Sequence, residues 1–138
     1  MILLDTDTIS LLLAEHSAVA ARFRAVADEV AIAIISRIEI MEGRFAFVMK
    51  AADGQQVLLA QEWLVRSESD LARFRIIPFD DAAAAEFDRL LGTKGLRRIG
   101  RGDLLIASIT LARGATLVTR NLKDYRKIQG LRLENWAD

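Results

Sequence analysis

The segment GRGDLLIASITLARGATLVTRNLKDY, residues 100–125, has the pattern of a helix, a turn and a strand in immediate succession. The nearly apolar run Asp103–Arg113 predicts a buried helix, which Gly114 ends. The short apolar run Ala115–Val118 predicts a strand, and residues 121–127 predict a short helix. Because a buried helix that leads into a short buried strand is typical of α/β domains, this segment predicts helices packed on a parallel sheet.

The same alternation extends over the rest of the chain. Strands are expected at Ile2–Leu4, Val30–Ile35, Arg75–Phe79 and Leu131–Leu133. Helices are expected at Ile9–Leu13, Ala18–Ala27, Gln55–Leu71, and after the predicted caps Ser36 and Asp81, the last one ending at Gly92. We therefore predict a single domain, residues 1–138, with an open α/β sandwich fold.

Composition limits the chemistry that the chain can perform. At 138 residues, 52% of them hydrophobic, the chain is large enough for a buried core. The absence of cysteine excludes disulfides, thiolate metal sites and a cysteine nucleophile. The single histidine, His16, excludes a nuclease that uses two imidazoles as base and acid. No signal peptide or run of membrane-spanning length is visible, so we expect a cytoplasmic protein without a membrane segment.

Charge is balanced overall but unevenly placed. The chain has 19 basic and 19 acidic residues, which weakens the case for non-specific nucleic-acid binding. Two basic clusters nevertheless stand out, formed by Lys94, Arg97, Arg98 and Arg101, and by Arg120, Lys123, Arg126 and Lys127. These clusters could attract a polyanion to one face of the protein, or they could be ordinary solvent-exposed loops and helix ends. The sequence supports both interpretations equally. On the first interpretation, Arg98, Arg101 and Arg120 are candidate contacts to such a polyanion.

Three acidic residues lie where predicted strands end or helices begin. Asp5 closes MILLD, Glu39 follows VAIAIIS, and Asp103 opens LLIASITLA. A parallel sheet would bring all three to one edge, where ligands bind in folds of this class. Carboxylates gathered there repel one another and need a cation. The sequence therefore predicts a Mg²⁺ site, with Mn²⁺ as a substitute, that serves phosphate chemistry.

Helix capping is the competing explanation for each acid. Ser36 and Glu39 form the Ser-x-x-Glu pattern of a capping box, and Asp103 directly precedes an apolar run. For Asp5 a metal ligand is favoured, because Asp7 and Thr8 are better placed to cap the first helix.

Polar residues also follow the strand Ala115–Val118. Thr119 and Asn121 leave that strand at the predicted edge, and Asp124 follows on the short helix. Thr119 is expected to hydrogen-bond a carboxylate or phosphate, whereas Asn121 offers a neutral amide oxygen.

These blocks together resemble PIN-domain proteins, and specifically VapC-type toxins of toxin–antitoxin pairs. The resemblance covers the whole chain through LLDTD, SRIEIMEG, residues 100–125 and the closing LRLENW. It implies a three-layer α/β/α sandwich with a mostly parallel central sheet. It also implies that Asp5 and Asp103 are Mg²⁺ ligands, that Glu39 completes the catalytic triad, and that Thr119, Asn121 and Asp124 support it.

One departure concerns the second metal ion. Many PIN nucleases carry a fourth acid at the place that Asn121 occupies here. One well-held Mg²⁺ is therefore expected, and a second is left open unless Asp124 reaches the site.

The resemblance implies an endoribonuclease in which a Mg²⁺-activated water cleaves a structured RNA such as a tRNA, leaving a 5′-phosphate and a 3′-hydroxyl. It also implies a cognate VapB antitoxin and a homodimer.

The alternative is a weak or inactive PIN domain that mainly binds its partner. The groove for that partner would involve Phe45, Phe47, Val48, Met49 and Trp63, although core packing is the more expected role of these residues. A phosphoacceptor receiver domain fits poorly, because the required Asp and Lys are missing after the relevant strands.

Overall fold

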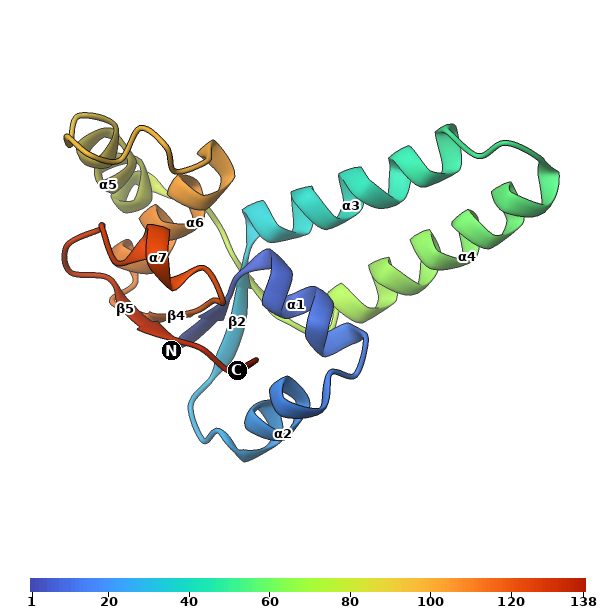
Figure 1. The fold of residues 1–138 in the computed structure, drawn as a ribbon, viewed down its shortest axis with the longest axis horizontal. Helices are drawn as coiled ribbons and strands as arrows, with labels where there is room; N and C mark the ends of the chain where they lie inside the picture. Colours follow the sequence, from blue (N-terminus) through green and yellow to red (C-terminus); the bar gives the residue numbers. More distant parts are fainter.

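A computed structural model describes residues 1–138 as alternating strands and helices (Figure 1). In chain order they are β1 (Ile2–Leu4), α1 (Thr6–Leu13), α2 (Ser17–Ala25), β2 (Val30–Ala33), α3 (Ile34–Met49), α4 (Gly54–Leu71), β3 (Arg75–Ile77), α5 (Asp81–Leu91), α6 (Arg101–Ala112), β4 (Thr116–Val118), α7 (Leu122–Tyr125) and β5 (Arg132–Glu134). Every predicted strand and helix is present.

The five strands form one sheet in the order β3-β2-β1-β4-β5, and all neighbouring strands are parallel. Strand β1 lies at the centre, where Leu3 is paired with Ala31 on one side and with Leu117 on the other. The predicted α/β fold is confirmed, and the sheet is entirely rather than mostly parallel.

Helices cover both faces of the sheet, because successive strand residues point to opposite faces. Leu3 belongs to a core that also contains residues of α5 and α6, such as Phe87 and Ile106. Its neighbour Leu4 belongs to a second core with Ile9 of α1 and Ile40 of α3. These two cores on either side of the sheet confirm the three-layer sandwich.

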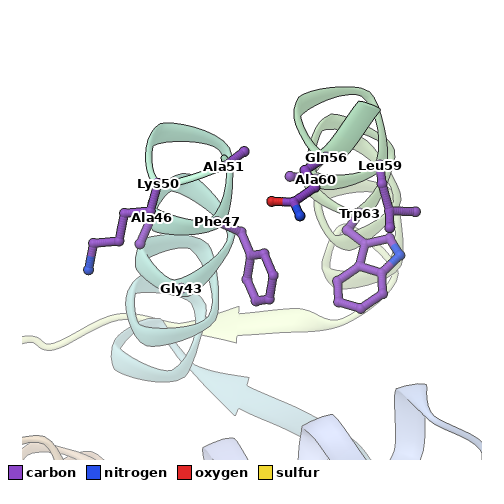
Figure 2. A pocket seen from close by; sticks show the side chains of 9 residues that line it. All are labelled: Gly43, Ala46, Phe47, Lys50, Ala51, Gln56, Leu59, Ala60 and Trp63. Carbon is purple, nitrogen blue, oxygen red and sulfur yellow. The ribbon is translucent and has the colours of Figure 1, made fainter. Parts of the chain in front are cut away.

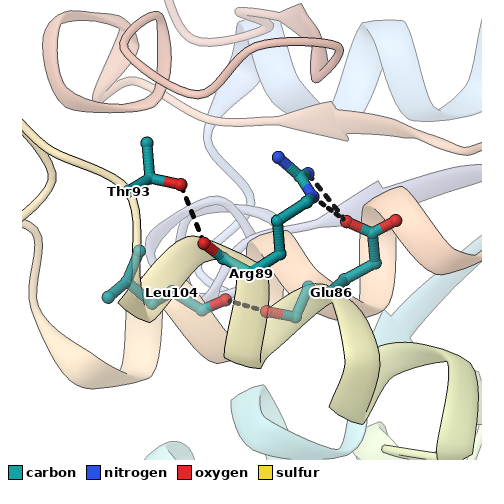
Figure 3. A network of polar contacts seen from close by, with 5 residues as sticks. Glu86, Arg89, Thr93 and Leu104 are labelled. Atoms are coloured by element: carbon teal, nitrogen blue, oxygen red, sulfur yellow. Dashed lines mark hydrogen bonds and ion pairs between the residues drawn. The ribbon is translucent and has the colours of Figure 1, made fainter.

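Helices α5 and α6 pack side by side on one face (Figure 3). On α5, the Arg89 guanidinium pairs with Glu86 at 2.7 Å, and just beyond the helix the Thr93 hydroxyl donates back to the Arg89 carbonyl at 2.8 Å. On α6, the Ser108 hydroxyl donates to the Leu104 carbonyl at 2.7 Å, so this buried hydroxyl is satisfied within its own helix. The Ser108 bond thus lets a polar residue sit in the apolar core.

Helices α3 and α4 extend together away from the sheet as a hairpin, which we call the arm (Figure 1). Core packing was the expected role of the apolar residues here, but that expectation is wrong for most of them. Phe45, Phe47, Met49 and Trp63 are between 43% and 83% exposed. The arm therefore presents apolar surface without a partner in the chain.

Several helix starts differ from the predictions. Strand β2 ends at Ala33, so Ile34 and Ile35 belong to α3, and Ser36 is inside the helix rather than at its cap. The predicted capping box of Ser36 and Glu39 is therefore wrong. Asp80, not Asp81, caps α5 by accepting a hydrogen bond from the Ala83 amide at 3.0 Å.

His16 caps α2 through its Nδ1 atom, which accepts from the Val19 amide at 3.3 Å. None of the helices combines the length and the apolar character that a bilayer crossing requires.

Candidate active site

The topology places the predicted acids around one end of two central strands. The chain runs from β1 to β2 and β3 on one side of the sheet, and β4 and β5 lie on the other side. The gap between the carboxyl ends of β1 and β4 is thus the switch point where parallel α/β sheets bind ligands. Asp5 follows β1 directly, and Thr119 follows β4.

Asp5 is buried, with 7% of its surface exposed. Its Oδ1 atom accepts from the Thr8 amide at 2.8 Å, and its own amide donates to the Val118 carbonyl at 3.0 Å. Asp5 is therefore the N-cap of α1, and the expectation that Asp7 or Thr8 would take that role is wrong. The cap uses one carboxylate oxygen, while Oδ2 has no hydrogen-bond partner.

Glu39 reaches the same region from the second turn of α3. Its Oε1 atom accepts from the Thr6 hydroxyl at 2.6 Å, and the Thr6 oxygen is 3.0 Å from the Ser36 hydroxyl. Its Oε2 atom lies against Gly102, where an added β carbon would stand only 2.7 Å away. Glu39 is thus brought from α3 to the first turn of α6.

Asp103 is the third residue of α6, because the helix begins at Arg101 and Gly100 is its N-cap. The competing explanation, that Asp103 caps this helix, is therefore excluded. Burial raises the pKa of Asp103, and the charges of Glu39, Asp5 and Asp124 raise that pKa further. Glu39, Asp5 and Asp124 are therefore close enough to Asp103 to disfavour its charged form.

Tyr125 is a site residue that the sequence reasoning missed. Its side chain is buried, and its hydroxyl makes no hydrogen bond of ordinary geometry. The hydroxyl still interacts with Asp103, which lowers the pKa of that carboxyl in part. Burial and the nearby charge of Asp103 raise the pKa of Tyr125, so the phenol stays protonated. The only signal in the sequence was its position at the end of the block NLKDY.

The three predicted supporting residues form a connected turn after β4. Thr119 is fully buried, and its Oγ1 atom accepts from the Asn121 amide at 3.0 Å. The Asn121 side-chain amide donates to Asp124 Oδ2 at 3.1 Å. Asp124 is also among the charges that raise the pKa of Asp103.

The three predicted RNA contacts lie in different settings. The Arg101 guanidinium stacks over the Phe87 ring at 5.4 Å, and Arg120 is paired with Asp138 at 3.6 Å. Arg98 is exposed in the connection between α5 and α6. Leu96 and Ile99 anchor that connection in the core, with 3% and 4% exposure.

The donor set is suited to a hard cation, since it consists of carboxylate, amide and hydroxyl oxygens without sulfur or imidazole. Burial first, and the neighbouring carboxylates second, raise the pKa of Asp103, and a divalent cation would favour its charged form against both. As the side chains stand, however, no three acidic groups converge closely enough to hold one ion together. Binding would therefore require the acidic side chains to rotate toward one another.

Comparison with known proteins agrees with this architecture. The family model described as PIN domain matches residues 2–131. Ribonuclease VapC2 of Rickettsia felis is 46% identical over 69 residues, which are 48% of this chain and 51% of that protein, so the match spans about half of that relative. The tRNA(fMet)-specific endonuclease VapC of Salmonella typhimurium is 31% identical over 94 residues, covering 65% of this chain and 70% of that protein.

Among solved structures, VapBC2 of Rickettsia felis, bound to a DNA fragment from its promoter, contains a chain that superimposes with a TM-score of 0.73. The two chains are 31% identical, and the alignment covers 99% of each. The chain therefore belongs to the PIN-domain family and, within it, to the VapC group.

Proposed function

We propose that this protein is a Mg²⁺-dependent endoribonuclease toxin that cleaves a structured RNA in the cytoplasm and is neutralised by a VapB antitoxin. One observation carries the proposal: burial and the charges of Glu39, Asp5 and Asp124 together raise the pKa of Asp103. Four carboxylates at the switch point of a parallel sheet are unfavourable without a cation and are well suited to binding one.

Bound Mg²⁺, with Mn²⁺ as a substitute, would neutralise charge on the scissile phosphate and activate a water. Asp5 and Asp103 would hold the ion. Asp5 suits this role because the Thr8 amide fixes one of its oxygens and leaves the other uncommitted. Glu39 would orient the attacking water, and the products would carry a 5′-phosphate and a 3′-hydroxyl. Asp124 and Asn121 would decide whether a second ion can bind.

A tRNA is the proposed substrate because a relative from Salmonella typhimurium is named a tRNA(fMet)-specific endonuclease. Unpaired loop nucleotides can be turned into a site of this kind, unlike paired ones. Arg98 and Arg101 are exposed near the start of α6 and would contact the RNA backbone. Arg120 would do so after release from Asp138.

The test is cleavage of purified tRNA by the antitoxin-free protein, with Mg²⁺ or with a chelator. Asp5→Asn should abolish Mg²⁺-dependent cleavage. Asp28→Asn makes the same substitution at an exposed residue just before β2, at the opposite edge of the sheet, and should leave cleavage unchanged. Full activity of Asp5→Asn, in a preparation free of other nucleases, would contradict the proposal.

A second candidate function is a partner-binding module with little or no catalysis. The exposed apolar residues of the arm support it. A groove of about 490 Å³ separates α3 from α4 (Figure 2). Phe47 and Trp63 face it from the two helices, with ring centroids 5.6 Å apart. We propose that VapB covers this apolar groove in either case, so RNA cleavage by the isolated chain separates the two functions.

We also propose that the free protein is a homodimer, since exposed apolar residues occur along both helices of the arm. Light scattering would give twice the chain mass of 15.4 kDa for a dimer. A single-chain mass without antitoxin would contradict this part of the proposal.

A further inference from the structure

The hydroxyl groups of Thr6 and Ser36 form a chain of hydrogen bonds that ends at Glu39. The Thr6 oxygen is 2.6 Å from Glu39 Oε1 and 3.0 Å from Ser36 Oγ. A hydroxyl has one proton to donate, and an ionised carboxylate can only accept. The Thr6 proton therefore points to Glu39, and Ser36 donates to Thr6.

The Thr6 bond is the one polar contact that the Glu39 carboxylate makes. Glu39 forms no ion pair and no other hydrogen bond. It is also exposed, and its long side chain would otherwise sample several rotamers. A hydroxyl-to-carboxylate bond of 2.6 Å falls in the short, charge-assisted range, so it is stronger than a bond between neutral groups.

Gly102 restricts the other side of the same carboxylate. With Glu39 in this place, a β carbon at position 102 would stand 2.7 Å from Oε2 and 3.3 Å from the Glu39 carboxyl carbon. Glu39 is thus held between the Thr6 hydroxyl and the backbone of α6. Both contacts link elements that are distant in the chain.

We infer that Thr6, backed by Ser36, is a positioning residue that fixes the Glu39 carboxylate for the reaction. The inference rests on the proposed nuclease function and assigns Thr6 no direct contact with the RNA. Thr6 directly follows Asp5, so the first turn of α1 positions two acids. Asp5 is fixed as the N-cap of the helix, and Glu39 is fixed by its hydrogen bond from the Thr6 hydroxyl. Ser36 is fully buried and keeps the Thr6 hydroxyl turned toward Glu39.

The kinetic test compares Thr6→Val, which removes the hydroxyl at nearly constant shape, with Thr6→Ser, which keeps it. Thr6→Val should lower kcat by roughly 10- to 100-fold, the usual loss when a supporting hydrogen bond is removed, with little change in KM. Thr6→Ser should stay close to wild type. Equal losses in both variants, or unchanged kcat in Thr6→Val, would overturn the inference.

A double-mutant comparison separates positioning from a general structural role. On a Glu39→Ala background, Thr6→Val should cause no further loss, because the carboxylate that it serves is absent. A further loss equal to that in the wild-type background would show that Thr6 acts independently of Glu39. Melting temperatures of all variants check that each one is folded.

Crystal structures of metal-free Thr6→Val and Thr6→Ser provide a readout that does not depend on activity. Glu39 should keep its place in Thr6→Ser and leave it in Thr6→Val. An unmoved carboxylate in Thr6→Val would overturn the inference even if the enzyme were active. An inactive wild type would instead defeat the proposed nuclease, while these structures would still decide whether Thr6 positions Glu39.

Discussion

Glu39 and Gly102, from helices α3 and α6, approach each other so closely that a methyl group at position 102 would stand 2.7 Å from Glu39 Oε2. The nearest obstacle is the far end of a flexible side chain, so a larger residue at 102 would displace Glu39 and leave the backbone in place. Glycine at position 102 is therefore needed for the placement of the Glu39 carboxylate rather than for the packing of the fold.

Gly102→Ala should accordingly reduce RNA cleavage at least tenfold while leaving the melting temperature unchanged or slightly higher, because alanine favours the helix over glycine. Gly43→Ala is the matched control. Gly43 is inside α3, nothing lies within 4 Å of its added β carbon, and both stability and cleavage should be maintained or improve. Wild-type cleavage by Gly102→Ala would show that Glu39 tolerates the displacement.

Asp103→Asn should stabilise the metal-free protein at neutral pH. Burial and the neighbouring acids raise the pKa of Asp103, so the folded state binds this proton more tightly than the unfolded state. The ionised carboxyl therefore lowers the free energy of unfolding above the raised pKa, and this penalty fades as pH falls toward the unfolded value. Removing the charge should raise the melting temperature by a few degrees at neutral pH.

The measurement is the difference in melting temperature between Asp103→Asn and wild type from about pH 4 to about pH 8, without metal. The difference should grow with pH as Asp103 ionises and then level off. Asp28→Asn, at an exposed position, should give a difference that stays near zero throughout. A difference that shrinks as pH rises would contradict the assignment of repulsion at Asp103.

Much of the fold was predictable, since the apolar runs and their glycine ends mark the elements. The start of α3 was not. Ile34 and Ile35 continue the apolar run of β2, yet β1 pairs only as far as Ile32 and β3 only as far as Ala33. Without a partner strand the chain turns into a helix, so tertiary structure overrides local propensity.

The candidate site was predictable only in part, for a related reason. Its acids stand beside strand ends, which a sequence reveals. The bond from Thr6 to Glu39 spans 33 residues, and no local pattern indicates it. The cap at Asp5 was missed because α1 begins at Thr6, three residues before its first apolar position, Ile9.

Mg²⁺ should raise the melting temperature of the wild-type protein by binding the folded state alone. At a concentration 100 times the dissociation constant, the stabilisation would be about 2.7 kcal/mol. Asp5→Asn should lose most of this shift, because it removes a proposed ligand, whereas Asp28→Asn should retain it. Differential scanning calorimetry in magnesium and in matched sodium chloride checks the prediction, and an equal shift in Asp5→Asn would place the ion elsewhere.

Phe47→Ala and Trp63→Ala should weaken antitoxin binding without reducing cleavage of RNA. Both rings line the groove of the arm, they lie 5.6 Å apart, and the Arg44 guanidinium stacks over Trp63 at 5.3 Å. Buried aromatic anchors commonly contribute about 2 kcal/mol or more to an interface, so each variant should bind the cognate VapB roughly 30-fold more weakly by calorimetry. Leu91→Ala is the control, since Leu91 is 55% exposed on α5, outside the arm, and should bind VapB normally. If all three variants bind equally well, VapB uses another surface, and the arm is left for contacts between copies of the chain.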